Sequence, residues 1–209
     1  MSELHELLAM LKMRGLALRE KQSSWPMRLL GKLLEHIAPG FMDHYITVIG
    51  STIWIPSQRW LADDPARSVR VLVHELVHDE DRSARLPLSF ELTYLFPQIL
   101  ALGALLAIPG SLLHLLWLLA LLPWPAPWRA FYEARGYAAQ HAMSCWQRGK
   151  PLDASPPGWI IDKFVRSPYL WMLPSRKLAR WLVRRELLRI QSGRMPSVLR
   201  ISQKLLGPR

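Results

Sequence analysis

Apolar residues near the N-terminus recur at helical spacing, and further on they change to strand patterns. Residues 2–20 are predicted to form a helix with a leucine-rich face, made by Leu4, Leu7, Leu8, Leu11 and Leu16. Residues 26–37 predict a second helix, which begins with a proline. Two β-rich runs, 45–49 and 52–56, flank Gly50-Ser51 and predict a hairpin with a two-residue turn.

The next helix is predicted from about residue 64 to residue 82. Asp64 is a suitable N-cap, Pro65 suits the first helical position, and residues 66–82 contain no Gly or further Pro. The segment is largely apolar through Val69, Leu72, Val73, Leu76 and Val77. This pattern is typical of a helix that is buried in a protein core.

A long uncharged segment follows, with no Asp, Glu, Lys or Arg from Leu92 to Trp128. Pro109-Gly110 divides it into two apolar arms, 95–107 and 112–122, each shorter than the roughly 20 residues that span a bilayer. We therefore predict an apolar helical hairpin over residues 95–122. Three interpretations stay open: a broken membrane span, a shallow membrane hairpin, and a hairpin packed within a soluble protein.

The last third of the chain predicts two further helices. A long helix is expected over residues 127–146, followed by a Pro-rich loop at 151–158. A basic amphipathic helix is expected over residues 175–191, with an apolar stripe formed by Leu178, Trp181, Leu182 and Leu188. Its cations are Arg176, Lys177, Arg180, Arg184, Arg185 and Arg189. The tail, residues 194–209, is basic and is expected to be loose.

The excess positive charge is confined to this last third. The chain has a net charge of +11, and residues 148–209 hold fourteen Lys and Arg against three Asp and Glu. Such an excess predicts an anionic partner, either phospholipid head groups or nucleic acid. No nucleic-acid-binding motif accompanies the charge, and the Leu/Trp stripe suits a core or a lipid surface, so nucleic acid is the less favoured partner.

Chain length and cysteine content limit the class of protein. A chain of 209 residues suits one hydrophobic core, so we predict a single domain over residues 1–209. Cys145 is the only cysteine, which excludes an internal disulfide and a cysteine-based zinc site. Residues 1–6 carry acid where a secretion signal needs base, so we expect a cytoplasmic protein. Membrane association through the apolar hairpin is an open addition to that expectation.

The predicted helix over residues 64–82 contains an H-E-x-x-H motif, His74-Glu75-Leu76-Val77-His78. Residues four apart share a helix face, so His74 and His78 can both bind one zinc ion. Glu75 lies beside them and can take a proton from a water molecule at the metal, as the general base of peptide hydrolysis. The alternative is a chance match on an ordinary amphipathic helix.

A catalytic zinc site usually has three protein ligands, so the two histidines need a third. The downstream candidates are Glu91, His114, Glu133 and His141. Glu133 is favoured because it is the only acid in its long helix, and because its small neighbours Ala130 and Ala134 allow close packing. Its alternative role is a salt bridge to Arg129 or Arg135.

The H-E-L-V-H motif, the two apolar arms and the later helix with its R-x-x-x-E-A-x-x-x-A-A pattern together resemble the gluzincin metallopeptidases. Within that group the chain is most similar to the HtpX-like and CAAX-prenyl-protease membrane enzymes and to the small soluble minigluzincins. The resemblance covers about residues 44–146, which would form the catalytic core. It implies that His74, His78 and Glu133 hold zinc and that Glu75 is the base.

One position departs from the pattern of that family. The family usually has an aspartate four residues after the glutamate, where this chain has Tyr137. That aspartate supports a zinc-binding histidine, so Tyr137 or a backbone carbonyl has to serve instead. The family also uses a downstream polar residue to stabilise the oxyanion. Tyr169 is the candidate here, with His141 and Arg135 as alternatives.

These patterns predict a mainly helical α+β protein, in which a β-hairpin precedes the motif helix and an apolar helical hairpin separates the two candidate zinc-binding segments. The resemblance implies that this protein has a zincin-like fold. The expected function is zinc-dependent hydrolysis of peptide bonds in a peptide or protein substrate. One alternative is a degenerate zincin fold used only for binding, which Tyr137 favours. The other is a basic protein that associates with membranes or nucleic acid, which the charge of the last third favours.

Overall fold

The computed structural model describes residues 3–35, 39–86, 88–97, 100, 125–165 and 172–206, with the backbone alone at His44, Leu205 and Leu206. Within these residues the protein is α+β and mainly helical, as predicted, with one small sheet. The helices are α1 (Glu3–Met13), α2 (Trp25–Leu34), α3 (Phe41–His44), α4 (Gln58–Asp63), α5 (Pro65–Ser83), α6 (Ser89–Leu95), α7 (Pro127–Gln147), α8 (Gly158–Val165), α9 (Arg176–Gln191) and α10 (Ser197–Leu206). The strands are β1 (Ala17–Glu20), β2 (Thr47–Ile49) and β3 (Thr52–Ile55), and the short 3-10 helix η1 (Lys21–Ser23) follows β1.

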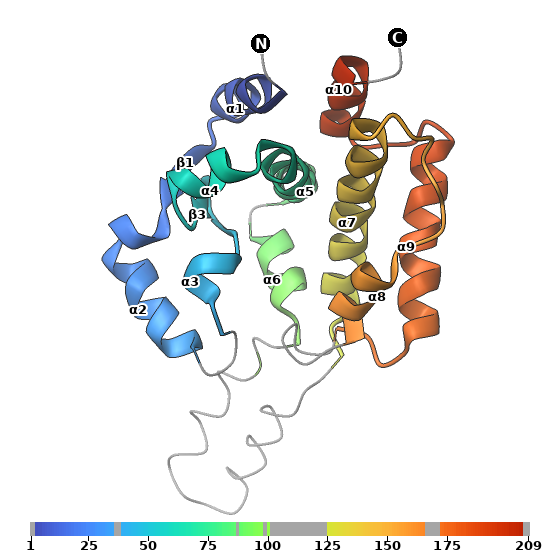
Figure 1. The fold of residues 1–209 in the computed structure, drawn as a ribbon. Helices are drawn as coiled ribbons and strands as arrows, with labels where there is room; N and C mark the ends of the chain where they lie inside the picture. The colour runs from blue at the N-terminus through green and yellow to red at the C-terminus, as the bar shows by residue number, and fades with distance from the viewer. Residues whose placement is uncertain are drawn as a thin grey trace, which may run out of the picture.

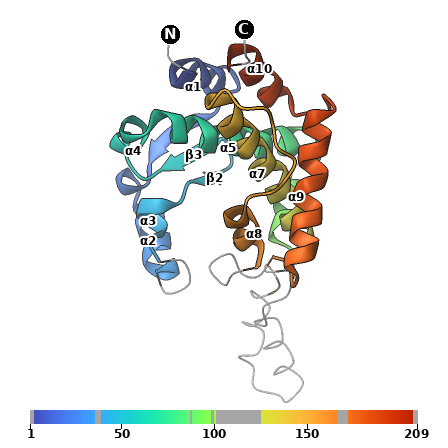
Figure 2. The ribbon, with the colours of Figure 1, turned by 45° about the vertical axis from the view of Figure 1, so that its right-hand side comes forward.

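Helices α5 and α7 pack against each other, and most of the other elements flank this central pair (Figure 1). Helix α9 packs on α7, α1 packs on α5, and α10 contacts both central helices. Both views place α1 and α10 at the same end of the molecule (Figure 2), where Arg14 donates a hydrogen bond to Ser197 Oγ at 3.1 Å. One continuous cluster of buried apolar side chains extends from Leu7 in α1 to Leu199 in α10.

The predicted β-hairpin is present. Strands β2 and β3 pair antiparallel, with Ile49 opposite Thr52 across the two-residue turn. Gly50 adopts a φ of +56°, a left-handed conformation that glycine reaches without steric cost. Its carbonyl accepts a hydrogen bond from Arg82 Nη1 at 2.6 Å, which fixes the turn to the end of α5. The strand order is β1-β3-β2, so β2 is an edge strand of the described sheet.

The prediction of one helix over residues 2–20 is wrong at its C-terminal end. Helix α1 ends early because Gly15 adopts a φ of +72° and closes the last turn. The N–H of Gly15 donates to the carbonyl of Lys12, and the N–H of Leu16 donates to the carbonyl of Leu11, both at 3.0 Å. The chain then forms β1, which pairs in parallel with β3.

The long helices begin and end close to the predicted bounds. Helix α5 starts as expected, because Asp64 Oδ1 accepts a hydrogen bond from the N–H of Arg67 at 2.9 Å and Pro65 occupies the first turn. Helix α7 covers residues 127–147 and α9 covers residues 176–191, each within one residue of the prediction.

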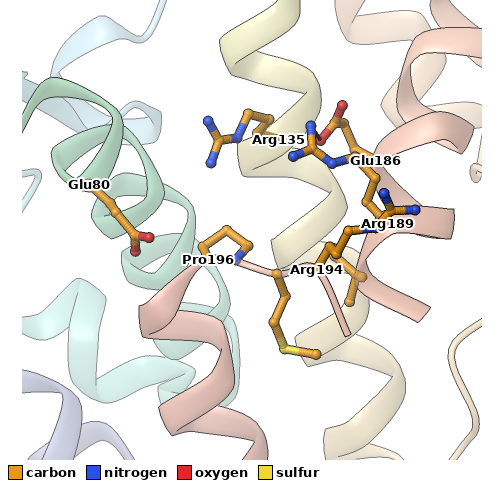
Figure 3. A pocket seen from close by; sticks show the side chains of 8 residues that line it. Glu80, Arg135, Glu186, Arg189, Arg194 and Pro196 are labelled. Carbon is orange, nitrogen blue, oxygen red and sulfur yellow. Dashed lines mark hydrogen bonds and ion pairs between the residues drawn. The ribbon is translucent and has the colours of Figure 1, made fainter. Parts of the chain in front are cut away.

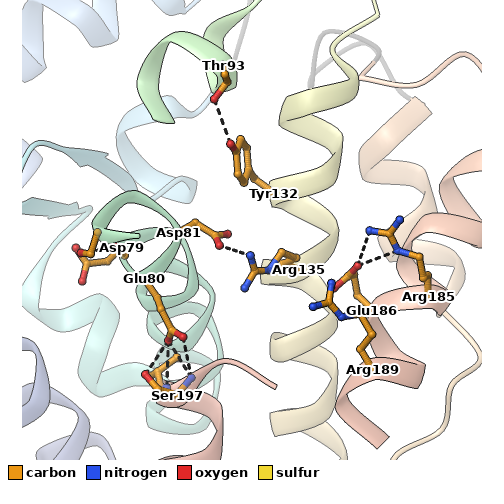
Figure 4. A network of polar contacts seen from close by, with 12 residues as sticks. Asp79, Glu80, Asp81, Thr93, Tyr132, Arg135, Arg185, Glu186, Arg189 and Ser197 are labelled. Carbon is orange, nitrogen blue, oxygen red and sulfur yellow. Dashed lines mark hydrogen bonds and ion pairs between the residues drawn. The ribbon is translucent and has the colours of Figure 1, made fainter. Parts of the chain in front are cut away.

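The apolar stripe expected on α9 is present, but most of it does not pack in the core. Of the expected apolar stripe, Leu182 alone is buried, whereas Leu178, Trp181 and Leu188 are 43%, 57% and 47% exposed. The helix instead buries a face with a similar helical spacing, formed by Ala179, Leu182, Val183, Glu186, Leu187 and Ile190. Glu186 can face inward because Arg185 and Arg189 pair with its carboxylate at 2.9 and 3.4 Å (Figure 4).

The tail is not loose, since residues 197–206 form α10. The carboxylate of Glu80 in α5 accepts hydrogen bonds from the backbone N–H of Ser197 at 2.9 and 3.0 Å, and from its hydroxyl at 2.9 Å (Figure 4). An acid at this position satisfies free N–H groups and complements the positive end of the helix. Val198 and Leu199 are buried beyond it.

The apolar segment is largely beyond what the structure describes. Of the predicted hairpin over residues 95–122, the described residues are Leu95, Phe96, Pro97 and Leu100. The interpretations of that hairpin therefore lie outside the described residues. In the part of the chain that is described, no helix has the length and apolar character needed to cross a membrane.

Candidate metal centre

The packing of α5 on α7 brings the two halves of the candidate site together. His74 and His78 lie one helical turn apart on α5 and are buried, and Glu133 is buried on the facing side of α7. Gly136, one turn beyond Glu133, allows the close approach: a Cβ at this position would lie 2.7–2.8 Å from three atoms of the His74 ring. Any larger residue at 136 would have to displace that ring.

The distances between the three side chains suit a single metal ion. The Nε2 atoms of His74 and His78 are 3.0 Å apart. Glu133 Oε2 lies 3.4 Å from Nε2 of His74, and Glu133 Oε1 lies 3.9 Å from Nε2 of His78. Three ligand atoms at about 2.0–2.2 Å from one tetrahedral zinc ion lie roughly 3.3–3.6 Å from one another. The observed distances bracket that range.

Burial and mutual contact shift the pKa of all three groups. Burial lowers the pKa of His78 to about 3, and the charge of His74 acts in the same direction. Burial also lowers the pKa of His74, but a hydrogen bond to Glu133 and the negative charge of that carboxylate outweigh it and raise the pKa. Burial raises the pKa of Glu133, but His74 more than offsets this and lowers it far below its usual range. A divalent cation bound here would displace the proton of the hydrogen bond between His74 and Glu133, because metal ligands bind in their deprotonated forms.

Glu75 directly follows His74 and is half-buried. Burial raises the pKa of its carboxyl group to about 7, although the neighbouring charge of His74 acts against this. In the part of the chain that the structure describes, its carboxylate has no ion-pair or hydrogen-bond partner. A free carboxylate that titrates near neutral pH is well suited to accept a proton.

Tyr94 on α6 belongs to the site, and sequence reasoning missed it. Its hydroxyl donates a hydrogen bond to Glu133 Oε1, and its ring lies edge-on to His78 at 5.9 Å. The guanidinium of Arg129 lies over the Tyr94 ring at 5.3 Å and contributes to the low pKa of Glu133. No motif marks Tyr94, because its partner is 39 residues further along the chain.

Tyr137 does not replace the missing aspartate as a hydrogen-bonding support. Its ring packs edge-on against the His74 ring, with centroids 4.6 Å apart. The Nδ1 atoms of His74 and His78 are buried and have no hydrogen-bond partner among the described residues, although the side chain of Gln140 acts to raise the pKa of His74. The two imidazole rings are therefore held mainly by packing. The His74 ring packs on Gly136 and on the ring of Tyr137.

Of the other candidate ligands, Glu91 and His141 lie elsewhere. Glu91 forms an ion pair with Arg82 at 2.8 Å. His141 is buried further along α7, with its Nε2 3.7 Å from Cys145 Sγ. His114 lies outside the described residues. Of the histidines and acids that the structure describes, the three that gather as a metal-binding group are His74, His78 and Glu133.

Of the candidates for oxyanion stabilisation, the two described ones, Arg135 and His141, pair with side chains outside the metal-binding group. Tyr169 lies outside the described residues. Arg135 pairs instead with Asp81 of α5, as Figure 4 shows. Arg135 also lines a separate cavity of about 290 Å³, together with Arg189, Arg194 and Glu80 (Figure 3). His74, His78 and Glu133 do not line this cavity.

No protein-family model matches the chain, and neither a curated protein nor a solved structure shows significant similarity to it.

Proposed function

We propose that the protein is a zinc-dependent metallopeptidase of the gluzincin type. The observation that supports it best is the buried group of His74, His78 and Glu133, whose ligand atoms all lie within 4.8 Å of one another. Two imidazoles and one carboxylate form the ligand set of catalytic zinc sites in several peptidases. The zincin-like fold and the resemblance of the motif to gluzincins are part of this proposal.

Each side chain of the site has a role in holding the metal. His74 and His78 bind through Nε2, since these atoms point toward each other and toward Glu133. Glu133 binds through its carboxylate while Tyr94 donates a hydrogen bond to Oε1 and so fixes its orientation. Zinc bound there would supply a Lewis acid that polarises a substrate carbonyl and makes water a stronger nucleophile.

Glu75 performs the proton transfers. Its carboxylate, whose pKa burial raises to about 7, accepts a proton from the attacking water and passes it to the leaving nitrogen of the cleaved peptide bond. A base with a pKa near the working pH is effective at both steps. Most of the zinc-binding group is shielded from solvent, which strengthens these interactions.

The proposed substrate is a peptide or a protein. Strand β2 has a free edge in the described sheet, and its turn is fixed to α5 through Gly50 and Arg82. An extended peptide can add to such an edge through main-chain hydrogen bonds, which would present its carbonyl groups near the motif helix. A cytoplasmic location remains our expectation for this activity.

A zinc-binding protein without peptidase activity is the second candidate. It is favoured by the Nδ1 atoms of His74 and His78, which have no hydrogen-bond partner among the described residues. Catalytic zinc sites commonly hydrogen-bond the outer nitrogen of each ligand histidine. Both candidates predict bound zinc, and they differ only in turnover.

The experiment is cleavage of a peptide library by the metal-free protein after titration with zinc, using wild type and Glu75→Gln. We expect cleavage by wild type that rises with zinc up to one equivalent, and at least a roughly 100-fold lower rate for the variant, because Gln cannot accept the proton. Equal rates for the two proteins would rule out the mechanism. Zinc binding with no cleavage by wild type would favour the second candidate.

A further inference from the structure

The outward face of α9 combines cations and large apolar side chains on the protein surface. In both ribbon views α9 lies at the outer side of the molecule, with α7 on its inner side (Figures 1 and 2). Arg176 and Arg189 are exposed at the edges of this surface and pair with Asp162 and Glu186. At 3.6 residues per turn, six other exposed residues of α9 fall within an arc of roughly 160°. They are Lys177, Leu178, Arg180, Trp181, Arg184 and Leu188.

The cations of this face are available to an external anion. Among the described residues, the side chains of Lys177, Arg180 and Arg184 have no ion-pair or hydrogen-bond partner. The only acid of α9, Glu186, is buried and already paired with Arg185 and Arg189. The face therefore carries positive charge with no compensating acid of its own helix.

The apolar residues of the face lie between these cations. Trp181 is 57% exposed, and the guanidinium of Arg185 lies 5.5 Å from its ring and 5.4 Å from the ring of Phe131. Leu178 is exposed about one turn before Trp181, and Leu188 about two turns after it. A tryptophan among cations suits the headgroup region of a bilayer, where its apolar ring and its N–H are both satisfied.

We propose that the outward face of α9 binds the surface of a membrane that contains anionic phospholipids. The exposed leucines favour lipid over nucleic acid, because a bilayer buries aliphatic side chains whereas a nucleic acid rewards cations and stacked aromatic rings. The helix would lie along the membrane surface, with Trp181, Leu178 and Leu188 inserted and Lys177, Arg180 and Arg184 at the phosphates. This proposal is independent of the proposed peptidase activity.

The test is sedimentation of the full chain with vesicles of phosphatidylcholine alone, or of phosphatidylcholine containing roughly one-third phosphatidylserine. A triple variant, Lys177→Gln, Arg180→Gln and Arg184→Gln, is compared with a charge-matched control, Arg59→Gln, Lys150→Gln and Lys204→Gln, whose cations are exposed outside α9. Trp181→Ser is compared with Trp25→Ser, an exposed tryptophan on α2. All of these side chains are exposed, and thermal unfolding of each variant checks that the fold is kept.

We expect binding to the anionic vesicles that weakens by roughly 100-fold in the α9 triple variant and by several-fold in Trp181→Ser, with far smaller losses in both controls. Three results would each overturn the proposal. They are equal losses in the α9 and control triple variants, equal binding to neutral and anionic vesicles, and tighter binding to a DNA duplex than to anionic vesicles at the same salt concentration.

Discussion

The ring of His74 packs directly against the backbone of Gly136, and a Cβ on Gly136 would come within 2.8 Å of three ring atoms. Glycine in the middle of a helix costs about 1 kcal/mol relative to alanine, so this position gives up local stability. What it gains is room for the imidazole between α5 and α7. This contact sets the position of one proposed zinc ligand, and it leads to a direct prediction.

Replacing Gly136 with alanine should displace the His74 ring and lower zinc affinity by about tenfold or more. Competition with a chromogenic chelator measures this. Gly158→Ala in α8 is the matched control, because a Cβ at Gly158 meets no atom within 4 Å. Zinc affinity equal to that of wild type in Gly136→Ala would show that His74 does not depend on this packing.

Removing the Tyr94 hydroxyl should weaken zinc binding by roughly 10–100-fold, because Glu133 then loses the hydrogen bond that orients its carboxylate. Tyr94→Phe keeps the ring contacts with His78, so packing is little changed. Tyr132→Phe is the control, since its hydroxyl contacts Thr93 at 3.1 Å and not a proposed ligand (Figure 4). If both variants bind zinc equally, Tyr94 has no role in positioning Glu133.

Glu133→Ala should lose zinc on dialysis, and Glu91→Ala should retain it. Glu133 lies 3.4 Å from Nε2 of His74, whereas Glu91 is paired with Arg82. Elemental analysis of the dialysed proteins gives the zinc content per chain. The same zinc content in the two variants would remove Glu133 from the proposed site.

The stability of the zinc-free protein should fall as the pH drops below about 6.5, in part because of His141. Burial and the charge of Arg148 lower the pKa of His141 below the unfolded value of 6.5. The unfolded chain therefore takes up this proton first, so the contribution is fully present above pH 6.5 and is lost as the pH falls toward the lowered pKa. His141→Asn should flatten the pH dependence by up to about 1.4 kcal/mol per pH unit. Urea unfolding at several pH values measures the slopes, and parallel curves would contradict the assignment.

Local patterns predicted much of the architecture around the site. The Asp64 cap, the hairpin at Gly50 and the bounds of α7 follow from interactions between residues close in sequence, and all are observed. The structure also brings Glu133 to His74 and His78, as the motif and the acid-poor helix suggested.

Features that depend on distant contacts were missed. Glu80 caps α10 from 117 residues away, and Tyr94 reaches Glu133 across 39 residues, so neither interaction leaves a local signal. The buried face of α9 could not be chosen from the sequence, because two of its faces share helical spacing and the buried one includes Ala179 and Glu186. Tyr169 and the apolar hairpin lie outside the described residues, so those predictions stand untested.

The most direct test of the proposed site is anomalous diffraction at the zinc absorption edge from crystals of the zinc-loaded protein. We predict one peak at about 2.0–2.2 Å from Nε2 of His74, from Nε2 of His78 and from a carboxylate oxygen of Glu133. A zinc peak elsewhere, for example beside His141 and Cys145, with none between α5 and α7, would contradict the assignment.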